Sequence, residues 1–107
     1  ELELRVPQTV LLASYPPQAY YRRHLDSYAG KDIPRMLTVL IYLAWEPRTG
    51  GQLRCHLASG SVDVEPLPGR LVIFYSQEVE HEVLPSRGRR LALTLWIWDV
   101  KKDDKGR

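Results

Sequence analysis

The sequence has 107 residues, of which 44% are hydrophobic and 26% charged, an ordinary composition for one compact domain and too short for two. Its 15 Lys and Arg against 13 Asp and Glu leave a net charge of +2, which gives no support for binding to nucleic-acid phosphates. The single cysteine, Cys55, excludes an intrachain disulfide and favours the reducing cytosol or nucleus, and no apolar run approaches the roughly 20 residues of a membrane span.

Short apolar runs rich in β-branched and aromatic residues, separated by Pro and Gly, predict an all-β chain in which residues 1–107 form a single domain. The eight expected strands are, in chain order, Thr9–Ser14, Tyr20–Asp26, Met36–Ala44, Gln52–His56, Val62–Glu65, Arg70–Tyr75, His81–Leu84 and Arg89–Trp98. This number and spacing predict a sandwich or a jelly-roll barrel. We expect the charged tail, residues 101–107, to fray. Because the sequence starts without an initiator Met or a signal-peptide pattern, we expect it to be the C-terminal part of a longer protein.

The last expected strand has two different faces, because side chains alternate along a strand. One face is purely aliphatic and needs an apolar cover, which we expect from helices in a missing N-terminal part of the protein. Its members are Leu91, Leu93, Leu95 and Ile97. The other face is mixed and indicates either the lining of a polar cavity or an edge strand with a solvated arginine. Its members are Arg90, Ala92, Thr94, Trp96 and Trp98.

Three histidines make the search for a metal site short. His24 and Asp26 lie two residues apart in a strand-like stretch, so we expect the imidazole and the carboxylate on the same side. His81 comes much later, and a barrel that pairs distant strands would bring it to the other two. Two imidazoles and one carboxylate on one side of a metal are typical of non-haem Fe(II) oxygenases, although zinc hydrolysis is also chemically conceivable.

Arg90 favours iron. It lies on the cavity-facing side of the strand that follows His81, where its planar fork would hold a carboxylate through two hydrogen bonds. A dicarboxylate cosubstrate that binds the metal at one end and pairs with Arg90 at the other would satisfy both sites.

Further segments accompany these residues in order along the chain. They are His24-Leu25-Asp26, Thr38-Val39-Leu40-Ile41-Tyr42-Leu43, Gly50-Gly51-Gln52-Leu53-Arg54, Val64-Glu65-Pro66, Gly69-Arg70-Leu71-Val72-Ile73-Phe74, His81-Glu82-Val83-Leu84-Pro85 and Arg90-Leu91-Ala92-Leu93-Thr94-Leu95-Trp96. Together they resemble the Fe(II)/2-oxoglutarate-dependent prolyl hydroxylases, above all the oxygen-sensing hypoxia-inducible-factor type and its bacterial and protist relatives. The resemblance runs from about Thr9 to Asp99. It implies a double-stranded β-helix, the jelly-roll or cupin-like core of that family.

The resemblance also implies the roles of the site residues, with Fe(II) bound by His24, Asp26 and His81 and the far carboxylate of 2-oxoglutarate held by Arg90. Further cosubstrate contacts are implied for Tyr15, Tyr42, Leu53, Val83, Thr94 and Trp96. The implied reaction uses O₂ to hydroxylate a prolyl residue of a protein or peptide, converts 2-oxoglutarate to succinate and CO₂, and is supported by ascorbate. For the substrate we predict contacts from Tyr21 and Arg35, although both positions are equally compatible with a plain surface role.

Other interpretations stay open. A related class of nucleic-acid demethylases generally has a second arginine where this sequence has Trp96, so we do not expect a nucleic-acid partner. We do not expect a membrane partner either. A hydroxylase of a free amino acid would use the same cavity. In a non-catalytic jelly-roll binding module, His24 would be a satisfied strand residue and Arg90 a salt-bridge partner. The oligomeric state is left open.

Three more polar residues are expected to lie outside the site. His56 follows Cys55 and points to the opposite side of its strand, so we expect a surface histidine and no zinc ligand. Glu80 and Glu82 flank His81 and, by the same alternation, face away from it. We expect both glutamates to be solvent-exposed or paired with arginines across strands.

Overall fold

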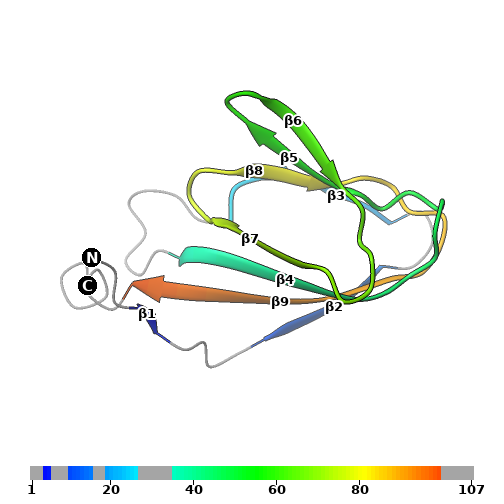
Figure 1. Cartoon of the computed structure of the whole chain (residues 1–107), viewed down its shortest axis with the longest axis horizontal. Coiled ribbons are helices and arrows are strands. Elements are labelled where there is room, and N and C mark those ends of the chain that lie inside the picture. The colour runs from blue at the N-terminus through cyan, green and yellow to red at the C-terminus, as the bar shows by residue number, and fades with distance from the viewer. Residues whose placement is uncertain (1–3, 6–9, 16–18, 27–34, 100–107) are drawn as a thin grey trace.

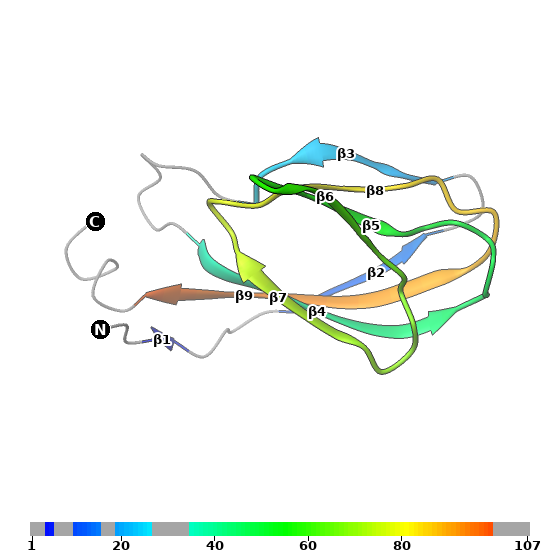
Figure 2. The same ribbon diagram turned by 45° about the horizontal axis from the view of Figure 1, so that its top comes forward.

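The computed structural model describes residues 4–5, 10–15, 19–26 and 35–99. These residues form two antiparallel sheets that face each other (Figure 1, Figure 2). The strands are β1 (Leu4–Arg5), β2 (Leu11–Tyr15), β3 (Tyr21–His24), β4 (Arg35–Trp45), β5 (Leu53–Leu57), β6 (Gly60–Val64), β7 (Leu71–Tyr75), β8 (Glu80–Val83) and β9 (Arg90–Asp99). The all-β prediction is confirmed, and the fold is the expected double-stranded β-helix. The described residues contain no helix that is long and apolar enough to cross a membrane.

The five-stranded sheet has the order β1-β9-β4-β7, and β2 also pairs with β9. Since Leu4 pairs with Asp99 and Leu11 with Thr94, β1 and β2 follow each other along one edge of β9. The four-stranded sheet has the order β3-β8-β5-β6. Consecutive strands therefore often lie in different sheets, and residues that are far apart in sequence become neighbours across the fold (Figure 2).

The observed strands follow the expected ones to within a few residues, with two differences. The short β1 was not predicted, because its two residues carry no alternation signal and pair only with the end of β9. The third strand ends at His24, so Asp26 lies in a bend and not in the strand predicted for it. The predicted start at Thr9 and the tail at 101–107 lie outside the described residues.

The core lies between the two sheets. Leu40 from the five-stranded sheet packs with three buried residues from the four-stranded sheet, namely Leu53, Cys55 and Val83. Partly buried Val64, Val72, Phe74 and Val79 complete the cluster. Because each strand presents alternate residues to the interior, these apolar residues share the space between the sheets with the polar side chains of the site.

The opposite face of the five-stranded sheet is apolar and exposed. Ile73 in β7 is 54% exposed and Leu43 in β4 is 41% exposed, whereas the residues that precede them, Val72 and Tyr42, are partly and fully buried. The aliphatic residues of β9 lie on the same outer face, half-buried against one another. The aliphatic face predicted for the last strand is therefore present, and its cover by helices from elsewhere in the protein stays a prediction.

Candidate metal and cosubstrate site

Two histidines from neighbouring strands form one wall of the site. His24 of β3 and His81 of β8 pair directly across the strands, and their ring centroids lie 4.2 Å apart. Nδ1 of His24 lies 2.7 Å from the carbonyl oxygen of Arg22, and Nδ1 of His81 lies 3.1 Å from that of Val79. Because a carbonyl oxygen only accepts, both Nδ1 atoms carry hydrogen. Both Nε2 atoms are thus the ring nitrogens available as ligands.

Asp26 completes the cluster from the bend after β3. Its Oδ1 lies 3.1 Å from Nε2 of His24 and 3.2 Å from Nε2 of His81. One ligand atom from each of the three residues lies within 4.8 Å of the others. His24 and Asp26 thus lie on the same side, as expected, but not because of strand alternation. The chain bends after β3, and Asp26 contacts residues of the facing sheet.

Those contacts fix the other carboxylate oxygen. Oδ2 of Asp26 accepts hydrogen bonds from the Thr38 hydroxyl at 2.7 Å and from the Trp96 indole N–H at 3.4 Å. Burial alone would raise the pKa of Asp26, but the hydrogen bonds from His81, Thr38 and Trp96 and the charge of His81 lower the pKa to about 2. The Asp26 carboxyl group is therefore ionised at neutral pH.

The contact with Asp26 also changes the pKa of His81. Burial would lower the pKa of His81, but the hydrogen bond and negative charge of Asp26 outweigh it and raise this pKa. When the His81 ring is protonated, the proton on Nε2 bridges to Oδ1 of Asp26. A cation that binds between these atoms displaces that proton, as is general for metal sites built from imidazoles and carboxylates.

Arg90 lies at the other end of the site, on β9. Its side chain is buried, and Nε donates to the carbonyl oxygen of Gly51 at 2.8 Å. One Nη donates to the hydroxyl of Tyr42 at 3.4 Å. Burial raises the pKa of that hydroxyl, although the charge of Arg90 opposes the rise, so Tyr42 remains neutral. These contacts hold the guanidinium in a fixed direction.

A cavity of about 260 Å³ joins the two ends. Its lining includes Tyr21, His24, Asp26, Arg35, Leu53, His81, Val83, Arg90, Thr94 and Trp96, ten of the residues that the sequence pointed to. Leu11, Ala13, Leu25, Thr38, Leu40 and Ala92 complete it. The cavity therefore has a cluster of metal-binding atoms, a buried cation and apolar walls between them.

Two predicted cosubstrate contacts are not among the described residues that line the cavity. Tyr42 is fully buried, does not line the cavity and contacts Arg90 from behind. Tyr15 ends β2 opposite Arg90, but its side chain lies outside the described part of the chain. The predicted substrate contacts Tyr21 and Arg35 both line the cavity. Arg35 donates to the carbonyl oxygen of Asp26 at 3.3 Å and stacks 3.8 Å above the Trp96 ring.

Sequence reasoning missed Thr38 as part of the site. The available signal was a hydroxyl residue on the inward side of a strand whose other inward residues, Leu40 and Tyr42, are apolar or aromatic. A buried hydroxyl in such a row needs a polar partner. That partner is Asp26, which only the bend after β3 brings within reach.

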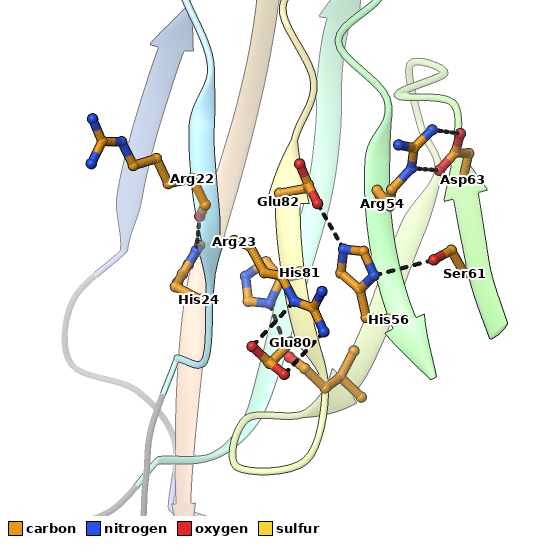
Figure 3. A network of polar contacts seen from close by, with 11 residues as sticks. Arg22, Arg23, His24, Arg54, His56, Ser61, Asp63, Glu80, His81 and Glu82 are labelled. Carbon is orange, nitrogen blue, oxygen red and sulfur yellow. Dashed lines mark hydrogen bonds and ion pairs between the residues drawn. The ribbon is translucent and has the colours of Figure 1, made fainter. Parts of the chain in front are cut away.

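The outer face of the four-stranded sheet carries a separate row of polar contacts (Figure 3). Glu80 points away from His81 and pairs with Arg23 at 3.2 Å, as predicted. Glu82 also points away, but its partner is His56 at 2.7 Å and not an arginine. Ser61 contacts the other ring nitrogen of His56. His56 lies on this outer face with a side chain that is 17% exposed, apart from the cluster of His24, Asp26 and His81.

The chain is similar in sequence to known proteins. Residues 10–98 match the family model described as the 2OG-Fe(II) oxygenase superfamily. Human "Prolyl hydroxylase EGLN3" is 36% identical over 99 residues, which cover 86% of this chain and 41% of the human protein. The chain thus spans less than half of that relative.

Two solved structures extend the comparison. A prolyl-4-hydroxylase from Pseudomonas putida is 50% identical with a TM-score of 0.73, over 84% of this chain and 49% of that one. A prolyl hydroxylase from Trichoplax adhaerens, solved in complex with a hypoxia-inducible-factor peptide fragment, is 30% identical with a TM-score of 0.84. That match covers 99% of this chain and 50% of the Trichoplax chain.

Proposed function

Because the chain belongs to the 2OG-Fe(II) oxygenase superfamily, we propose that it is the core of a dioxygenase that hydroxylates a prolyl residue of a protein or peptide. The reaction uses O₂ and converts 2-oxoglutarate to succinate and CO₂. The observation that carries the proposal is the cavity that joins His24, Asp26 and His81 at one end to buried Arg90 at the other.

The residues at the first end fit Fe(II). Two imidazole nitrogens and one ionised carboxylate oxygen form the donor set that non-haem Fe(II) oxygenases use. The backbone carbonyls of Arg22 and Val79 fix both rings so that Nε2 faces the metal position. When bound, Fe(II) supplies the activation of O₂, which the side chains of this protein do not provide themselves.

The residues at the second end fit the far carboxylate of 2-oxoglutarate. Arg90 is buried and positively charged, so its guanidinium offers a strong, water-poor binding position for a carboxylate. Tyr42 and the Gly51 carbonyl orient it from behind. Between the two ends, Leu40, Leu53 and Val83 match the aliphatic middle of the cosubstrate and exclude water from it.

We place the peptide at the rim of the cavity. Tyr21 is 51% exposed yet lines the cavity, which is the position expected of a residue that touches both solvent and substrate. Arg35, fixed by Trp96 and the Asp26 carbonyl, is the second proposed contact. Ascorbate is the proposed auxiliary reductant that keeps the iron ferrous.

Mass spectrometry of a full-length protein that contains this chain tests the proposal. After incubation with proline-containing peptides, Fe(II), 2-oxoglutarate and O₂, we expect a peptide heavier by one oxygen atom, with the addition located on proline. Omission of 2-oxoglutarate or the His81→Ala substitution should abolish it. Succinate formation with free proline but with none of the peptides would instead favour a hydroxylase of a free amino acid.

A further inference from the structure

A chain of two hydroxyl groups connects the interior of the five-stranded sheet to Asp26. Ser76 follows directly after β7, and its Oγ lies 2.8 Å from Oγ1 of Thr38 on β4. Thr38 Oγ1 in turn lies 2.7 Å from Oδ2 of Asp26. Ser76 is 0% exposed and Thr38 is 1% exposed, so neither hydroxyl exchanges its partner with solvent.

The direction of the hydrogen bonds follows from the number of protons. An ionised carboxylate only accepts, so Thr38 must donate its single hydroxyl proton to Asp26. Thr38 can then only accept from Ser76, and Ser76 must donate. Two aligned O–H groups polarise each other in a buried environment, which strengthens the bond that reaches the carboxylate.

The backbone fixes the first member of this chain. The peptide N–H of Ser76 donates to the carbonyl oxygen of Met36 at 3.0 Å, which extends the pairing of β7 with β4 by one more contact. Ser76 is therefore held by the sheet and Thr38 by its own strand, and Thr38 holds Asp26 through its side chain. Through these two hydroxyl groups, Asp26 in its bend is connected by hydrogen bonds to residues that the five-stranded sheet holds in place.

We propose that Thr38 and Ser76 are positioning residues that make Asp26 a ligand through one oxygen only. Oδ2 is engaged by Thr38 and Trp96, whereas Oδ1 faces both histidine Nε2 atoms. A carboxylate held in this way cannot turn to offer both oxygens to a metal ion, so it leaves more of the metal surface for other ligands. The inference rests on the metal role proposed above.

Titration with Co(II), a spectroscopic substitute for Fe(II), tests the proposal without turnover. Thr38→Val keeps the shape of the side chain but leaves Oδ2 with only the longer hydrogen bond from Trp96, so we expect Co(II) binding weaker by about 10- to 100-fold and altered visible absorption bands. Thr38→Ser keeps the hydroxyl and should restore both the affinity and the bands. Ser76→Ala leaves Thr38 without its donor and should weaken binding in the same direction by a smaller factor.

Ser86→Ala is the matched control. The Ser86 hydroxyl is also 0% exposed and donates to a backbone carbonyl, that of Gly88 at 2.8 Å, but it makes no hydrogen bond to Asp26. We expect wild-type Co(II) affinity and bands for this variant. Should Thr38→Val fail to fold, Ser76→Ala and Thr38→Ser carry the comparison.

The outcomes separate the two proposals. Wild-type affinity and bands in both Thr38→Val and Ser76→Ala would overturn the positioning role and leave the metal site intact. Weaker binding in Thr38→Ser equal to that in Thr38→Val would also overturn it, because the hydroxyl would then not matter. A wild-type protein that binds no Co(II) would overturn the metal role itself, and with it this inference.

Discussion

Arg90 shows how much of the proposed chemistry depends on one side chain. A buried guanidinium is costly unless its hydrogen-bonding groups are used, and Gly51 and Tyr42 are among the residues that accept from it here. The residue also lines the cavity. A carboxylate that enters the cavity therefore meets a cation that is already oriented.

Replacement of Arg90 by Ala should raise the KM for 2-oxoglutarate on the order of 10- to 100-fold, because hydrogen bonds to charged groups contribute about 1.5–3 kcal/mol. The measurement is the rate of succinate formation against 2-oxoglutarate concentration. Arg54→Ala is the control, since Arg54 forms only an exposed pair with Asp63 on the outer face. An unchanged KM in Arg90→Ala would remove this residue from its role.

The thiol of Cys55 should react slowly with alkylating reagents in the folded protein. Burial, together with the negative charge of Asp63, raises the pKa of the Cys55 thiol, and its side chain packs in the core. Since the thiolate is the reactive form, alkylation by iodoacetamide at pH 8 should be at least about tenfold slower than in urea-unfolded chain. Mass spectrometry of timed samples gives both rates, and equal rates would contradict the packing described for the core.

At the scale of single residues, the sequence identified the ends of the site better than its supports. His24, His81 and Arg90 carry titratable or charged groups at inward positions, so alternation and chemistry pointed to them directly. Thr38 and Ser76 carry only hydroxyl groups, and their importance depends on contacts with a bend. No local pattern encodes that bend, which explains why Asp26 was wrongly predicted to lie within a strand.

Among the elements, the connection from β4 to β5 determines where Arg90 points. It passes through Gly50 and Gly51, whose φ values are +88° and +78°, and Gly50 forms an isolated bridge with Ser86. The Gly51 N–H donates to the carbonyl oxygen of Pro85 at 3.1 Å, and its own carbonyl accepts from Arg90. The left-handed backbone is thus needed to turn that carbonyl toward the arginine.

Gly50→Ala should destabilise the protein more than Gly69→Ala, although the two glycines have nearly equal φ values of +88° and +87°. A Cβ at Gly50 would overlap the Pro85 carbonyl oxygen, whereas a Cβ at Gly69 meets nothing within 4 Å. We expect a loss of about 1 kcal/mol for Gly69→Ala from backbone strain, and roughly 1–3 kcal/mol more for Gly50→Ala from the overlap. Urea unfolding measures both, and equal losses would refute the close approach.

The strands themselves were predictable, and their pairing was not. Alternation of apolar residues located all of the longer strands, because a half-buried strand imposes that period on its own sequence. The pairing of His24 with His81, by contrast, depends on which strands share a sheet. That choice is made by the packing of the whole core, so the sequence alone could not show that the three side chains meet.

At the scale of the whole molecule, the site depends on both sheets at once. The two histidines come from the four-stranded sheet, whereas Arg90, Thr38 and Trp96 come from the five-stranded sheet. Asp26 follows a strand of the first sheet and takes hydrogen bonds from the second. A cation bound to Asp26 and the histidines would therefore stabilise the contact between the two sheets as well as the site.

Mn(II), a redox-inert substitute for Fe(II), should consequently raise the melting temperature of the protein. A ligand that binds only the folded state contributes about 2.7 kcal/mol at a concentration of 100 Kd, which for a domain of this size corresponds to a shift on the order of 10 °C. His81→Ala removes one of the three donors and should lose most of the shift. His56→Ala, which removes an imidazole from the outer face, should keep it. Differential scanning calorimetry with and without Mn(II) compares the three proteins, and a shift in His81→Ala as large as in wild type would show that the ion stabilises the fold from some other place.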